Sequence, residues 1–96
     1  MIAIPQKRSL PLGRVVSTPG ALEEISKAGQ APSEFLDRHS RSDWGDLSRM
    51  DWRRNDQAME DGERILSAYM TKDGVKVWII TEWDRSSTCL LLPGEY

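Results

Sequence analysis

An Asp-Gly pair between two β-rich segments is the feature that most constrains how this chain can fold. Asp73-Gly74 separates residues 65–71 from residues 76–82, and both segments are rich in β-branched and aromatic side chains. Asp-Gly is a preferred sequence for the tight turn of a β-hairpin. The sequence therefore predicts that these two segments pair as antiparallel strands.

Two further β-rich segments extend this sheet. Residues 87–92 follow a short turn at residues 83–86, and Pro93 marks their end because proline cannot donate to a strand ladder. Near the start of the chain, residues 14–17 form a short β-branched segment. We expect an antiparallel meander of three strands, or of four strands when residues 14–17 join it.

Capping residues predict three helices between the first strand and the meander. Thr18-Pro19 is typical of an N-cap followed by the first helical position, and Gly29 is typical of a helix end. A second helix is expected to open at Pro32, and a third is expected to run from the N-cap Ser48 to Gly62. The order β-α-α-α-β-β-β predicts an α+β domain with helices packed on one face of an antiparallel sheet.

The length of 96 residues accommodates one domain. We place this domain at residues 13–96 and treat residues 1–12 as an extended N-terminal arm, because Pro5 and Pro11 bias their predecessors away from helix. No run of 18 apolar residues exists, so no membrane partner is expected. The single cysteine fits a reducing compartment, and the N-terminus lacks the charge order of a signal peptide, so a cytoplasmic location is expected.

Charge is unevenly distributed along the chain. Residues 1–20 carry three basic side chains and no acidic one, whereas residues 21–62 carry ten acidic and six basic side chains. The formal net charge of the whole chain is −2. A mildly acidic domain does not attract nucleic-acid phosphates over its whole surface. Nucleic-acid binding is therefore not expected except through a local basic patch.

The residues that carry chemistry in enzymes form no convincing set. His39 is the only histidine, and Asp37 lies near it, but the sharp turn that holds a nucleophilic serine is missing. Cys89 lies in a predicted strand and is expected to be an inert buried thiol. Four aspartates lack the spacing of a calcium loop and are read as a solvated surface: Asp43, Asp46, Asp51 and Asp56. We predict no catalytic residue, no cofactor and no metal.

Tryptophan content and one turn indicate a surface for a protein partner. The chain has four tryptophans, of which Trp44 and Trp83 lie next to turn residues. Tryptophan is enriched at binding hot spots, so we expect one of these two to be partly exposed. Glu82, Asp84 and Arg85 crowd the same turn. They either form a charged catalytic or binding cluster at the sheet end or serve the turn, with Asp84 bonded to nearby amides and Arg85 paired with an acid. The candidate partner-binding residues are Trp44, Trp83, Asp84 and Arg85.

Several segments give the chain a resemblance to a known family. They are Asp43-Trp44-Gly45-Asp46, Asn55-Asp56, residues 62–69, residues 77–86 and the ending Leu92-Pro93 with Glu95-Tyr96. Together they resemble a family of small bacterial proteins from plasmids and other mobile elements, often labelled "plasmid-related protein" or "type I restriction subunit M". The chain has neither the glycine-rich cofactor loop nor the Asn/Asp-Pro-Pro-aromatic motif of an adenine methyltransferase, so the second label does not describe its chemistry. The resemblance implies a mobile-element protein and supplies no catalytic residue.

Three functions follow from these observations. The first is a non-enzymatic protein-binding accessory factor of a bacterial mobile element, linked to defence or counter-defence, that has a protein partner and is able to form a homodimer through a strand edge or an apolar sheet face. An alternative is a small ribonuclease toxin, which requires Arg64, Lys76 and Arg85 to converge on the sheet. A second alternative is an acidic antitoxin or nucleic-acid mimic that uses the helices between residues 21 and 62.

Overall fold

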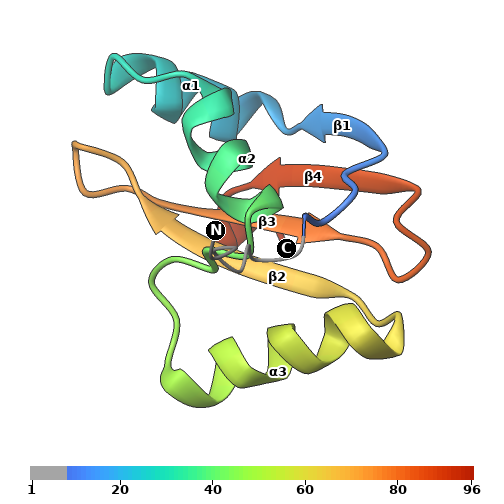
Figure 1. Cartoon of the computed structure of the whole chain (residues 1–96). Coiled ribbons are helices and arrows are strands. Elements are labelled where there is room, and N and C mark those ends of the chain that lie inside the picture. The colour runs from blue at the N-terminus through green and yellow to red at the C-terminus, as the bar shows by residue number, and fades with distance from the viewer. Residues whose placement is uncertain (1–8) are drawn as a thin grey trace, which may run out of the picture.

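The computed structural model describes residues 9–96 and shows a four-stranded sheet with three α-helices and a short 3₁₀ helix (Figure 1). The elements, in chain order, are β1 (Arg14–Ser17), α1 (Pro19–Lys27), α2 (Pro32–Ser40), α3 (Arg49–Asp61), β2 (Ile65–Met70), β3 (Lys76–Thr81), β4 (Ser87–Leu91) and η1 (Pro93–Glu95). This order confirms the predicted β-α-α-α-β-β-β arrangement of an α+β domain.

The sheet is mixed, and the prediction of a purely antiparallel sheet is wrong. The strands lie in the order β1-β4-β3-β2, and the meander β2-β3-β4 is antiparallel as expected. In contrast, β1 pairs with β4 in the parallel direction, with Val16 opposite Cys89. Two strands joined by a tight turn must be antiparallel, but β1 reaches β4 through all three helices and two strands. A connection of that length leaves either direction open, so no turn signal could decide it.

Local sequence explains the helix boundaries. The hydroxyl group of Thr18 accepts a hydrogen bond from the Ala21 amide, and Ser48 does the same for Asp51 at the start of α3. Pro32 opens α2. Gly62 ends α3 in the left-handed conformation, with a φ of 69°. The predicted helix starts at Pro19 and Pro32, the Ser48 cap and the end at Gly62 are confirmed.

One face of the sheet carries the main core. Alternate residues of β2, β3 and β4 point to this face, and α1 and α2 cover it with Ile25 and Phe35. The core residues shared by these elements are Ala21, Ile25, Phe35, Tyr69, Val77, Ile79 and Leu90. On the opposite face, Trp78 packs edge-on against Tyr96, with ring centroids 5.9 Å apart. Both faces of β3 are therefore apolar, as the alternation of its sequence predicts.

Helix α3 lies along the β2 edge of the sheet and not over the covered face (Figure 1). The Asn55 side-chain amide donates to the Leu66 carbonyl at 2.7 Å, and its oxygen accepts from the Leu66 amide. Beside it, Gly45 forms a parallel bridge with Ala68. Gly45 has a φ of 77°, and a side chain there would collide with the Ala68 carbonyl, so only glycine permits this approach. The expectation that all helices pack on one face therefore holds only for α1 and α2.

The packed part of the chain begins before residue 13. Leu10 is 3% exposed and belongs to a second apolar cluster with Trp44, Ala58 and Ile65. Its amide donates to the Ser40 carbonyl at 2.7 Å. The remainder of the expected arm, residues 1–8, lies outside the described residues. Over residues 9–96, no helix has both the length and the apolar character needed to cross a membrane.

Candidate partner-binding surface

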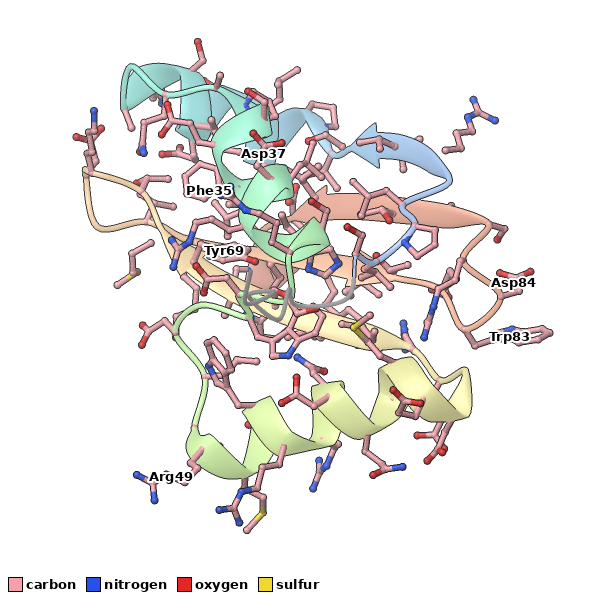
Figure 2. All side chains as sticks on the ribbon, viewed as in Figure 1. Phe35, Asp37, Arg49, Tyr69, Trp83 and Asp84 are labelled. Carbon is pink, nitrogen blue, oxygen red and sulfur yellow. The ribbon has the colours of Figure 1, made fainter. Side chains whose placement is uncertain are left out.

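The turn between β3 and β4 presents Trp83 to solvent. Its side chain is 66% exposed, and Figure 2 shows it pointing away from the sheet beside Asp84. The Asp84 carboxylate accepts a hydrogen bond from the Ser86 amide at 3.1 Å. Hydrogen bonding by Ser86 lowers the pKa of Asp84 below its ordinary value. The expected bond between Asp84 and a nearby amide is thus confirmed. The expectation that Trp44 or Trp83 is partly exposed is met by Trp83.

Arg85 fastens this turn to the end of α3. Its guanidinium group donates to the carbonyl oxygens of Ala58 at 3.0 Å, Glu82 at 3.1 Å and Glu63. Arg85 adopts a φ of 61°, which is uncommon for a residue with a side chain. The expected pairing of Arg85 with an acid is wrong, because helix ends and turns leave backbone carbonyls that a guanidinium group can satisfy.

The start of β1 lies against the same turn. The Arg14 amide donates to the Ser86 carbonyl at 3.0 Å. A side chain at Gly13 would collide with the carbonyl oxygens of Arg85 and Ser86, so this glycine lets the two segments touch. The Trp83 turn is therefore held on two sides, by α3 through Arg85 and by β1 through Ser86.

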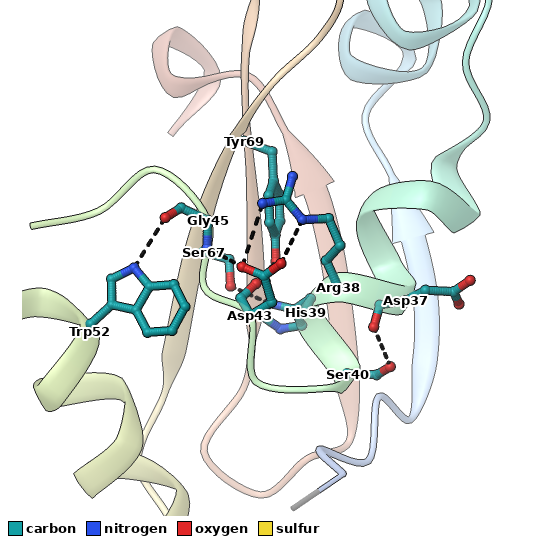
Figure 3. A network of polar contacts seen from close by, with 9 residues as sticks. All are labelled: Asp37, Arg38, His39, Ser40, Asp43, Gly45, Trp52, Ser67 and Tyr69. Atoms are coloured by element: carbon teal, nitrogen blue, oxygen red, sulfur yellow. Dashed lines mark hydrogen bonds and ion pairs between the residues drawn. The ribbon is translucent and has the colours of Figure 1, made fainter. Parts of the chain in front are cut away.

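Trp44 lies in the core, so its side chain offers no surface to a partner in this structure. It is fully buried, and its indole N–H donates to the Asp56 carboxylate at 2.9 Å. The segment that carries it is held by Asp43, which pairs with Arg38 at 2.8 Å and accepts a hydrogen bond from the Tyr69 hydroxyl through its backbone carbonyl (Figure 3). Adjacent turn residues suggested exposure, but these contacts fold the segment over the β2 edge.

His39 occupies the centre of a buried chain of hydrogen bonds. The Thr88 hydroxyl donates to the Leu12 carbonyl, and this leaves Thr81 as the donor in its 2.7 Å bond to Thr88. The imidazole Nε2 must then be the donor to Thr81 at 2.8 Å, and in a neutral ring Nδ1 accepts from Ser67 at 2.5 Å. The lowered pKa of His39 keeps the ring neutral, so its proton lies on Nε2.

The surroundings of His39 keep it neutral and out of reach of a substrate. Its ring is fully buried and packs edge-on against the Trp44 ring, with the two ring centroids 5.6 Å apart. Burial, assisted by the positive charge of Arg85, lowers the pKa of His39 from 6.5 to about 4. A buried, fully hydrogen-bonded histidine is a structural group, which agrees with the absence of a nucleophile motif in the sequence.

Other residues considered from the sequence are separated in the structure. Cys89 is half-buried on the face opposite the helices, and burial raises the pKa of its thiol, so it favours the unreactive protonated form. Within residues 9–96, no three acidic, cysteine or histidine side chains are grouped as a metal site would require. Lys76 lies opposite Met70 in the strand register, at the turn end of the β2–β3 hairpin. Arg64 forms an ion pair with Glu82 at the other end of the hairpin. The basic residues that a ribonuclease toxin requires therefore do not converge.

A pocket of about 320 Å³ lies between α3 and the chain end, and no motif in the sequence indicated it. Arg54, Arg64, Leu66 and Tyr96 are among its lining residues. The Arg64 guanidinium donates to the Tyr96 hydroxyl at 2.8 Å and pairs with Glu82 at 3.5 Å, so its charge is already engaged. Only the β2–β3 register, which sets residue 64 opposite residue 82, could have suggested part of this site.

No protein-family model, curated protein or solved structure matches this chain.

Proposed function

We propose that this protein is a non-enzymatic, cytoplasmic protein-binding factor of a bacterial mobile element, and that Trp83 is the anchor of its binding surface. The observation that carries the proposal is the combination of a 66% exposed indole with a turn braced by three guanidinium–carbonyl hydrogen bonds. A turn whose backbone is braced before association loses less conformational freedom on binding than a mobile one. Such residues dominate the binding energy of many interfaces.

The expected energy of this anchor is large enough to measure. A tryptophan buries roughly 150–250 Å² when it is covered, and most of the Trp83 side chain is still free to be covered. At about 25 cal/mol per Å², covering it contributes about 3 kcal/mol. We therefore expect Trp83→Ala to weaken binding to the partner by roughly a hundredfold.

The test is affinity capture from the producing bacterium with matched variants. Met50 on α3 is 69% exposed, so Met50→Ala removes a similarly exposed apolar side chain from a different surface. We expect one protein to be recovered stoichiometrically with the wild type and with Met50→Ala, and to be lost with Trp83→Ala. Equal recovery with Trp83→Ala would exclude the Trp83 anchor.

The same experiment separates this proposal from the two alternatives. Recovery of RNA or ribosomes, together with growth arrest on expression, would favour the ribonuclease toxin. Capture of a basic protein that is released by moderate salt and is insensitive to Trp83→Ala would favour the acidic antitoxin or mimic. Recovery of the protein alone under all growth conditions would contradict protein binding as its function.

A further inference from the structure

The two edges of the sheet differ in how their backbone groups are satisfied. At the β2 edge, the Asn55 amide pairs with Leu66, and the Asp46 and Ala68 amides bond with the Ala68 and Trp44 carbonyls. At the β1 edge, the amides of Arg14 and Thr18 point inward to β4. In a parallel pair, alternate residues point their N–H and C=O groups to opposite sides. Val15 and Ser17 therefore direct their N–H and C=O groups away from β4, and within residues 9–96 these groups form no backbone hydrogen bond.

The open edge also carries exposed apolar side chains. Val15 is 44% exposed and Val16 is 39% exposed, and Leu22 on the adjoining α1 is 48% exposed. Figure 1 shows β1 as the outermost strand of the sheet. An exposed β-branched edge strand is a template for pairing with another strand. Proteins usually protect such edges. Among residues 9–96, side-chain and loop contacts cover the β2 edge, whereas none bonds the outward backbone groups of β1.

We propose that a second copy of this chain pairs with β1 in the antiparallel direction and forms a two-fold symmetric dimer. The register that uses all the outward groups sets Val15 of one copy opposite Ser17 of the other, with the two Val16 residues facing each other at the symmetry axis. This arrangement makes four backbone hydrogen bonds and joins the two sheets into one of eight strands. The same surface serves both copies, as a two-fold interface requires.

Charge complementarity supports a second copy as the occupant. In this register, Arg14 of one copy lies opposite Thr18 of the other. The Thr18 hydroxyl donates to the Glu95 carboxylate at 2.7 Å, and the Leu92 amide donates to the same oxygen at 2.8 Å, so Glu95 is fixed beside Thr18. Arg14 is exposed and forms no ion pair within residues 9–96. Each copy thus brings a free cation to the fixed carboxylate of the other.

Sedimentation equilibrium of the purified full chain tests this dimer with a substitution that acts only on the outer edge. Val15→Pro removes an outward N–H group and leaves the hydrogen bonds to β4 intact, because proline is tolerated on the free side of an edge strand. Val15→Ala shortens the same side chain but keeps the N–H group. We expect a concentration-dependent dimer whose dissociation constant rises at least tenfold with Val15→Pro and much less with Val15→Ala.

A double-mutant cycle on the proposed ion pair provides a second, independent test of the dimer. Glu95→Gln keeps an oxygen for Thr18 and Leu92 but removes the charge, and Arg14→Gln removes the cation. Each single variant is expected to weaken the dimer severalfold, and the double variant no further, because both remove the same ion pair. A wild type that stays monomeric at millimolar concentration would overturn the proposal. So would a dimer that Val15→Pro leaves unchanged, because another surface would then hold it.

Discussion

Mild acidification should destabilise this protein through its single histidine, His39. The imidazole is neutral and fully buried, with Nδ1 accepting from Ser67 and Nε2 donating to Thr81. Its pKa is lowered to about 4 in the folded protein, against 6.5 for the ordinary group that the unfolded chain exposes. The unfolded state therefore binds a proton in the pH range where the folded state does not.

The sign and size of the effect follow from linkage. Between pH 6.5 and pH 4 the unfolded chain carries more protons, so the free energy of unfolding decreases as the pH falls. The two pKa values imply a loss of about 2 kcal/mol between pH 7 and pH 5, and of about 3 kcal/mol once the pH is below both. The contribution of His39 is fully present above the unfolded pKa and is lost as the pH falls through the folded pKa.

Two measurements check this prediction. His39 is the only histidine, so the pH titration of its imidazole resonance by NMR needs no assignment by mutation, and we expect no midpoint near 6.5 in the folded protein. Urea unfolding followed by tryptophan fluorescence at pH 7 and pH 5 gives the change in stability. His39→Gln should lower stability at pH 7 but lose most of the wild-type pH dependence. A midpoint near 6.5, or equal pH dependence in the wild type and His39→Gln, would show that burial of His39 does not set the pH dependence of stability.

Two further predictions concern contacts that hold the turn and the sheet edge. Arg85→Gly should lower the free energy of unfolding by about 2 kcal/mol because three backbone carbonyls lose their donor. Arg85→Ala should lower it by about 1 kcal/mol more because the φ of 61° suits glycine. Urea unfolding of both variants measures these losses, and equal losses would contradict backbone strain at this position. Asn55→Ala should lower the free energy of unfolding by about 2 kcal/mol because the outward N–H and C=O groups of Leu66 lose their partner. Asn55→Asp is the matched variant, because it keeps only an acceptor. A melting temperature of Asn55→Ala within 1 °C of the wild type would show that water replaces the side-chain amide without loss of stability.

The parts of the fold that local chemistry decides were predictable from the sequence. The Asp73-Gly74 turn sets the β2–β3 pairing, and the caps at Thr18 and Ser48 set two helix starts. The hydroxyl groups bond amides three residues away, and the hairpin turn joins adjacent segments, so short windows of sequence contain all the information required. The alternation around Trp78 likewise predicted a strand that is apolar on both faces.

The candidate site depended on contacts that no short window contains. Arg85 bonds the Ala58 carbonyl, 27 residues away, and the burial of Trp44 depends on Asp56 and on the approach of Gly45 to β2. The parallel direction of β1 was equally inaccessible, because a long connection carries no directional signal. For Trp44 and Arg85, neighbouring turn residues suggested an exposed side chain and an ion pair, and the tertiary structure uses both residues differently.

The proposed dimer surface at β1 and the proposed partner surface at Trp83 can be tested separately, and dimerisation would strengthen partner binding. Pairing through β1 uses the outward backbone groups of Val15 and Ser17, whereas the proposed partner anchor is Trp83, on a turn that Arg85 fastens to α3. A dimer would therefore carry two exposed anchors in a fixed relation, and a partner with two sites would bind it more tightly than either anchor alone allows. Trp83→Ala should then leave the dimer intact, while Val15→Pro should weaken capture only of a partner with two sites. If both variants abolished both dimerisation and partner capture, the turn and the β1 edge would form a single interface.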